Sequence, residues 1–130
     1  MTETPQRGLW VLRILSAVLL VAAGGIHLYL VFNGVGGILG VMFVLNAVAA
    51  LVLAIAMVVL HGRLLQAATV LSLLFLIATL LALVLALTVG LFGITQTWDF
   101  TLVPTTVIVE SIGILVLAVT TFVVLRTPPD

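Results

Sequence analysis

The chain contains no cysteine and no lysine, and only 6% of its residues are charged. The absence of cysteine excludes disulfide bonds, thiolate metal sites, cysteine-attached haem and dithiol redox chemistry. Soluble domains carry about a quarter charged residues, so this charge content excludes a water-soluble domain. The formal net charge is zero and the bases form no cluster, which argues against a nucleic-acid partner and against a polybasic lipid-binding tail.

Hydrophobic residues make up 65% of the chain, and the mean hydropathy is +1.55. They fall in four runs, each at or above the roughly 20 residues that cross the hydrocarbon core as a helix. We therefore expect one domain over residues 1–130, an all-α integral membrane protein that folds as a four-helix transmembrane bundle. The helices are predicted at about residues 9–32, 36–60, 64–91 and 102–126.

Polar or glycine-rich segments separate the runs. They lie at 33–37, 61–63 and 93–99, and the last is the longest. The first run resembles a secretory signal at its start, but it continues to Phe32 without a small-residue cleavage site, so we expect a first transmembrane helix.

The bases of the chain are Arg7, Arg13, Arg63 and Arg126, and four crossings place all of them on one side. The positive-inside bias then predicts that both termini and the 61–63 turn are cytoplasmic. We expect the charged end of Arg13 to extend to the lipid head groups. The lysine-free composition, rich in Arg, Ala, Val and Leu, favours a bacterial source, and so a multi-pass protein of the bacterial cytoplasmic membrane.

Small and polar residues recur at helical spacing in each run. Small residues let helices approach closely and polar residues avoid lipid, so these faces are predicted to point inward. The G-x-x-x-G in the second run is interpreted as packing within the bundle, with a homodimer seam as the alternative. The four faces consist of Arg13, Ser16, Leu20, Gly24 and His27; Gly36, Gly40, Ala47 and Ala54; Ser72, Phe75, Thr79 and Ala86; and Thr106, Glu110, Gly113, Leu117 and Thr121.

Glu110 is the only acid inside any of the runs. A carboxyl group in the middle of a membrane helix costs about 2.5–3.5 kcal/mol on insertion scales. Three functions would account for it: a proton-carrying acid, a cation ligand, or the anchor for the polar head of a lipid or quinone. The structural alternative is a neutral acid that bonds His27, Asn46 or a threonine hydroxyl and holds the bundle in register.

Other polar residues lie near the same, outer end of the bundle. At 1.5 Å per residue, His27 is ~7 Å and Glu110 roughly 9–12 Å below the outer surface. We predict a site that opens outward between the first, second and fourth helices. The candidate ligand or proton site consists of Glu110, His27, Asn46, Thr106 and Asp99.

His27 and the Trp98–Asp99 pair also have interpretations that are purely structural. His27 alone would satisfy one neighbour through a ring nitrogen, and the Trp98–Asp99 pair would act as an interfacial anchor and cap, or as a lid. A zinc site needs more ligands than the chain supplies there, so no metal is predicted. No nucleophile–base pair, phosphate loop or dinucleotide motif occurs, so no catalytic residue is predicted.

Residues 12–15 and 21–28, from Leu12-Arg13-Ile14-Leu15 through Gly24-Gly25-Ile26-His27-Leu28, resemble the first helix of the DoxX-like four-helix membrane proteins. That group opens with an arginine and an apolar stretch that ends in a small-Gly step before a polar or basic residue. The resemblance covers this segment and the four-span layout, and carries over to Arg13, Gly24 and His27. It implies a partner subunit of quinone-associated redox or thiol-stress complexes, although the chain lacks the cysteine that thiol chemistry requires.

From these observations we expect a small non-catalytic membrane protein. It would be an accessory subunit of a larger membrane complex, or a homo-oligomer, and would hold a lipid or quinone in an outer-leaflet cavity, with no other cofactor. The alternatives are a small proton or solute carrier or channel that uses Glu110, and a quinone-linked redox subunit.

Overall fold

The computed structural model describes residues 3–91, 93, 95–99 and 102–128, and within this part the chain forms four α-helices. They are α1 (Glu3–Phe32), α2 (Gly37–Val59), α3 (Gly62–Thr88) and α4 (Val103–Arg126). All four helices of this described part are long and apolar enough to cross a membrane. The prediction of four helices, each able to cross a membrane by its length and composition, is therefore confirmed for the described residues.

Two helix boundaries differ from the prediction by more than two residues. α1 begins at Glu3 rather than near residue 9, because a helix can continue beyond the hydrocarbon core. Pro5 falls in its first turn, where a missing amide hydrogen breaks no helical bond. α3 ends at Thr88 rather than 91, because Gly90 takes a left-handed conformation (φ 92°) and donates its N–H to the Leu85 carbonyl at 2.7 Å.

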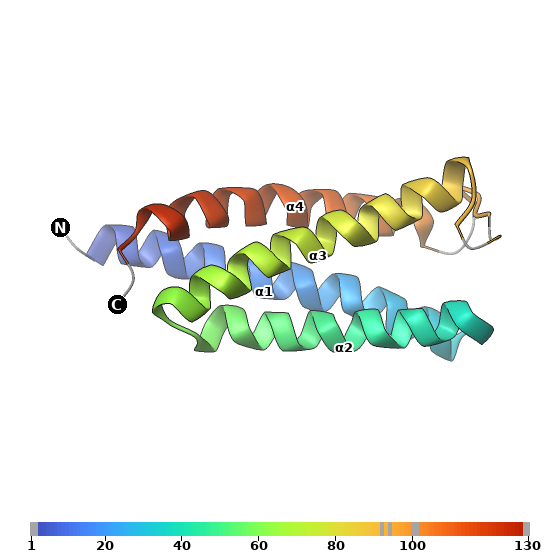
Figure 1. Cartoon of the computed structure of the whole chain (residues 1–130), viewed down its shortest axis with the longest axis horizontal. Helices are drawn as coiled ribbons and strands as arrows, with labels where there is room; N and C mark the ends of the chain where they lie inside the picture. Colours follow the sequence, from blue (N-terminus) through green and yellow to red (C-terminus); the bar gives the residue numbers. More distant parts are fainter. Residues whose placement is uncertain (1–2, 92, 94, 100–101, 129–130) are drawn as a thin grey trace.

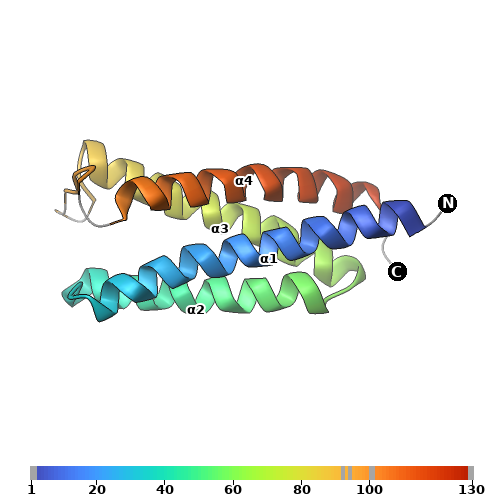
Figure 2. The same ribbon diagram turned by 180° about the vertical axis from the view of Figure 1, so that it is seen from behind.

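The helices run up and down in chain order, and both termini lie at the same end (Figures 1 and 2). α1 packs against α2 and α4, and α3 packs against α4. The contact between α2 and α3 is the least extensive of these pairs. These two helices are close at the turn that joins them and diverge toward the opposite end of the bundle (Figure 1).

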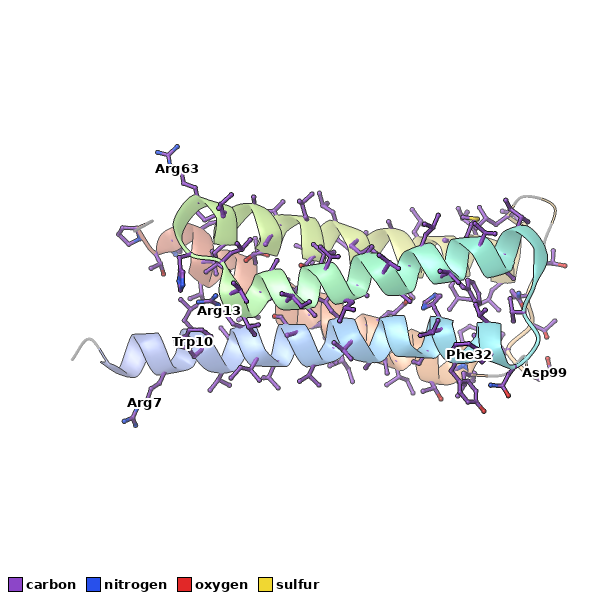
Figure 3. All side chains as sticks on the ribbon, turned by 90° about the horizontal axis from the view of Figure 1, so that it is seen from below. Arg7, Trp10, Arg13, Phe32, Arg63 and Asp99 are labelled. Atoms are coloured by element: carbon purple, nitrogen blue, oxygen red, sulfur yellow. The ribbon has the colours of Figure 1, made fainter. Side chains whose placement is uncertain are left out.

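The charged residues distinguish the two ends of the bundle. Arg7, Arg13 and Arg63 lie at the end that holds the termini, which we call the arginine end, whereas Phe32 and Asp99 lie at the opposite, distal end (Figure 3). The distal end also holds the connection between α3 and α4. This asymmetry is the one from which the orientation in the membrane was predicted.

The predicted inward face of α1 is confirmed, since all five of its residues are buried. On α4 the face is buried from Thr106 to Leu117, but its last member is Thr120 rather than Thr121. On α2 Gly36 is exposed, whereas Ala50 and Met57 are buried together with Gly40 and Ala54. On α3 Ser72 and Ala86 are buried, whereas Phe75 and Thr79 are partly exposed.

α1 and α2 approach each other closely at Gly24. A Cβ atom on Gly24 would lie 2.6 Å from the Cβ of Ala50 and 3.4 Å from the Cα of Ala47, both on α2. The Cβ of Ala50 cannot move away by a change of rotamer, so a side chain at residue 24 would force α1 and α2 apart. A Cβ on the neighbouring Gly25 would meet no atom within 4 Å.

We expect Gly24→Ala to lower the free energy of unfolding by about 1–3 kcal/mol, the usual cost of overpacking. Gly25→Ala is the matched control, and should be neutral or slightly stabilising because alanine favours helix. Both are measured by unfolding in mixed micelles with increasing SDS. Equal stability of the two variants would show that α1 and α2 are not packed through Gly24.

Arg13 does not extend to the head groups, and this prediction was wrong. Its side chain is 3% exposed, and its Nε and Nη2 donate to the carbonyl oxygens of Met57 and Leu60, each at 2.7 Å. The guanidinium carbon also lies 4.1 Å from the centroid of the Trp10 ring. The carbonyls of the last turn of a helix have no hydrogen-bond partner within that helix. Because α2 ends beside Arg13, the guanidinium group donates to these carbonyls. In Figure 3 Arg13 points between the helices, whereas Arg7 and Arg63 point outward.

Candidate functional site

A cavity of about 150 Å³ lies in the distal half of the bundle. All four described helices and the connection between α3 and α4 contribute to it. The lining is His27 and Leu30 of α1; Leu39, Met42, Phe43 and Asn46 of α2; Thr79, Ala82, Leu83 and Ala86 of α3; Leu91 and Gln96 of the connection; and Val103, Thr106 and Glu110 of α4.

Exposure separates the floor of this cavity from its walls. The lining residues of α1 and α4 are all buried, whereas those of α2 and α3 are at least partly exposed except Ala86. α2 and α3 are also the helices that diverge toward this end (Figure 1). The cavity therefore opens at the side of the bundle, between α2 and α3.

The sequence predicted a site between the first, second and fourth helices, which omitted α3. Thr79 and Ala86 were assigned to the inward face of α3, but Ala82 and Leu83 carry no polar signal that would have placed them at a site. At the distal side, the backbone N–H of Gln96 donates to the Ala86 carbonyl at 2.8 Å and holds the connection against α3. Residues of this connection line the side that was predicted to open outward.

Glu110 lies on the floor of the cavity. Its side chain is 0% exposed, and neither carboxyl oxygen has a hydrogen-bond partner among the described residues. The structural alternative required a bond from His27, Asn46 or a threonine hydroxyl. Thr106 instead donates its hydroxyl to the Leu102 carbonyl at 2.7 Å, and His27 is engaged with α1. The bonds that would make Glu110 a structural tie are thus absent from this part of the chain.

His27 is held by its own helix. Its Nδ1 lies 2.7 Å from the Ala23 carbonyl oxygen, and its ring meets the Phe43 ring edge to face at 4.8 Å between centroids. Because a carbonyl only accepts, Nδ1 carries the proton, and Nε2 of the neutral ring is an acceptor. The interpretation that one ring nitrogen satisfies a neighbour is confirmed, and the other nitrogen is available to the cavity.

Asn46 and Asp99 differ in their relation to the cavity. Asn46 lines it, and its buried Oδ1 has no hydrogen-bond partner in the described ranges. Asp99 is exposed, accepts a hydrogen bond from the Thr97 hydroxyl and does not line the cavity. Of the predicted site residues, the structure thus brings together Glu110, His27, Asn46 and Thr106, and leaves Asp99 at the surface.

Two polar lining residues, Thr79 and Gln96, were not included in the predicted site. Thr79 donates its hydroxyl to the Phe75 carbonyl at 2.6 Å, and Gln96 belongs to the connection. The sequence assigned Thr79 to the inward face of α3 but did not indicate that this face reaches the cavity, and nothing in it indicated which way Gln96 points. No group of three or more His, Cys, Asp or Glu side chains suited to a metal ion occurs in residues 3–91, 93, 95–99 and 102–128.

The layer next to the cavity on its arginine side is apolar, and the buried polar side chains of Ser16, Thr69, Ser72 and Thr120 lie farther toward the arginine end. Leu20, Leu76 and Leu117 belong to one packed cluster, and each is 0% exposed. A Cβ atom on Gly113, one turn from Glu110, would lie 2.6 Å from the Cδ1 of Leu76, so this layer is closely packed. The cavity therefore ends at a filled core on its arginine side.

Comparison of the chain with protein-family models, with curated proteins and with solved structures finds no match. The resemblance of the first helix to DoxX-like proteins stays a prediction.

Proposed function

We propose that this chain is a non-catalytic membrane protein that binds a lipophilic molecule in the distal cavity, with the polar head of that molecule at Glu110. The observation that carries the proposal is the fully buried carboxyl group without a hydrogen-bond partner in the described structure, at the floor of a cavity with largely apolar walls. An unpaired carboxyl in hydrocarbon is costly and is rarely kept without a functional reason.

The position of the opening supports a ligand that comes from the bilayer. In an embedded bundle the gap between α2 and α3 faces lipid, so a molecule can enter sideways without crossing water. A cavity of about 150 Å³ holds a group the size of a benzene ring. It thus accommodates a head group or ring, while the rest of a lipid or quinone extends between α2 and α3 into the membrane.

The arginine end is assigned to the cytoplasm by the positive-inside bias. This orientation puts the cavity in the outer-leaflet half of a bacterial cytoplasmic membrane. The short connections and the absence of any catalytic motif support the role of an accessory subunit that carries its ligand within a larger membrane complex.

A carrier or channel is the weaker candidate. Transfer of a proton or solute past Glu110 requires a route to the arginine end, and Leu20, Leu76 and Leu117 fill the interior on that side. The geometry favours a pocket with one entrance over a pathway with two.

Filling the cavity tests the proposal. We expect wild-type protein, extracted in mild detergent and measured by native mass spectrometry, to retain a lipophilic molecule. Ala82→Leu, which projects into the cavity, should reduce the retained fraction about tenfold, because overpacking a site costs about 1–3 kcal/mol.

Ala78→Leu is the matched control, since Ala78 is on the same helix, is exposed and does not line the cavity. Equal retention by the two variants would refute binding in this cavity. The same spectra report protein partners, and a chain that recruits none at fixed stoichiometry would contradict the role of accessory subunit.

A further inference from the structure

Three of the polar side chains that line the cavity donate their hydrogen bonds to backbone carbonyls of their own helices. Thr79 and Thr106 donate their hydroxyls to the carbonyls of Phe75 and Leu102 in their own helices. His27 commits its Nδ1 proton to the Ala23 carbonyl. A hydroxyl or a neutral imidazole that has donated in this way offers only lone pairs to a further partner. These three groups therefore face the cavity as hydrogen-bond acceptors.

The unpartnered groups are acceptors too. Both oxygens of Glu110 and the Oδ1 of Asn46 are buried without a partner among the described residues. The carboxyl group offers at least one accepting oxygen whether or not it carries a proton. The remaining side-chain donors in the lining are the amides of Asn46 and Gln96, together with the O–H of Glu110 when its carboxyl group is protonated. The cavity thus presents many more acceptors than donors.

We propose that the ligand is a lipophilic primary amine, with its ammonium group at Glu110 and its apolar chain between α2 and α3. An ammonium group has three N–H donors and no acceptor, which complements this lining, and its charge complements the carboxylate. A quinone carbonyl offers only acceptors, so most of the lining would stay unpaired. This inference rests on the proposed function and narrows it from any lipid or quinone to one head-group chemistry.

The size of the cavity limits the head group. About 150 Å³ accommodates an ammonium group and the first carbons of its chain, but not a whole phospholipid. The amine comes either from an amine-headed membrane lipid that inserts only its terminus, or from a free single-chain amine. Both sources share the N–H donors that the proposal requires.

A matched series of probes tests the head group directly. Full-length protein is titrated with dodecylamine, with dodecyltrimethylammonium, which has the same chain and charge but no N–H, and with decylubiquinone, and bound molecules are counted by native mass spectrometry. We expect dodecylamine to bind about tenfold more tightly than either of the others, the effect of one charge-assisted hydrogen bond. Glu110→Gln should abolish most of this preference.

Ser72→Ala is the control variant, because Ser72 is buried and polar but does not line the cavity, and it should keep the preference. Tighter binding of decylubiquinone, or equal binding of the two ammonium probes, overturns the amine assignment and leaves the proposed function standing. The proposed function itself is overturned if none of the three probes binds, or if the probes bind the Ala82→Leu variant as tightly as they bind the wild type. Nanodiscs distinguish the two sources of the amine. Weaker binding of dodecylamine in phosphatidylethanolamine than in phosphatidylcholine nanodiscs supports the lipid source, and equal binding in the two supports the free amine.

Discussion

Glu110→Met should make the ligand-free protein more stable, by about 1–3 kcal/mol in the free energy of unfolding. Glu110 is 0% exposed and its carboxyl oxygens have no partner among the described residues, so burial removes its hydration and returns no hydrogen bond. Methionine fills a similar volume without polar oxygens. The gain is measured by SDS unfolding after the bound molecule has been removed by detergent exchange.

Glu110→Gln is the graded control for this result. The amide keeps the shape and removes the charge but still buries unpaired polar atoms, so its gain should be smaller than that of methionine. A loss of stability in both variants would mean that the carboxyl group holds the bundle together through bonds that form in the membrane, as the structural alternative requires. Added ligand should reverse the order, because only the wild type has the group that the head contacts.

Arg13→Met should be more destabilising than Gly24→Ala, and should lower the free energy of unfolding by about 2–4 kcal/mol. The guanidinium group donates to the carbonyls of Met57 and Leu60, and each loses its partner in the variant. A buried carbonyl without a partner costs about 1–3 kcal/mol. Thermal unfolding in detergent, followed by circular dichroism, measures the effect.

Two variants make the interpretation of Arg13 specific. Arg13→Lys keeps the charge but lacks the planar fork that reaches two carbonyls at once, so its stability should lie between those of wild type and Arg13→Met. Arg7→Met removes an exposed arginine on the same helix and should change stability by less than about 0.5 kcal/mol. If Arg7→Met and Arg13→Met were alike, the cap on α2 would contribute nothing measurable.

The sequence was sufficient to predict the helices and the inward faces of α1 and most of α4. Length and hydropathy determine a span, and a stripe such as Ser16, Leu20 and Gly24 defines a face because polar and small side chains avoid lipid. Thr120 replaced Thr121 on α4 because two adjacent threonines carry the same signal, and only packing against α1 distinguishes them.

The contacts between elements were harder to predict. The role of Arg13 depends on α2 ending beside it, and an arginine near a membrane rim looks the same in sequence whether it reaches lipid or a carbonyl. The share of α3 in the cavity depends on the angle at which α2 and α3 diverge, and no residue spacing in an almost uniformly apolar helix records that angle. Glu110 could be identified from the sequence because it is the only acid inside the four apolar runs, whereas the cavity beside it could not be predicted.

Photolabelling in the bilayer tests the central claim most directly. A long-chain alcohol with a diazirine beside its head group is incorporated into vesicles with the wild-type protein, and the labelled peptides are mapped after irradiation. We expect labelling concentrated in residues 39–46, 79–86 and 103–110, and its suppression by Ala82→Leu. Labelling spread evenly over the lipid-exposed faces of the bundle, and unchanged in Ala82→Leu, would contradict a binding site around Glu110.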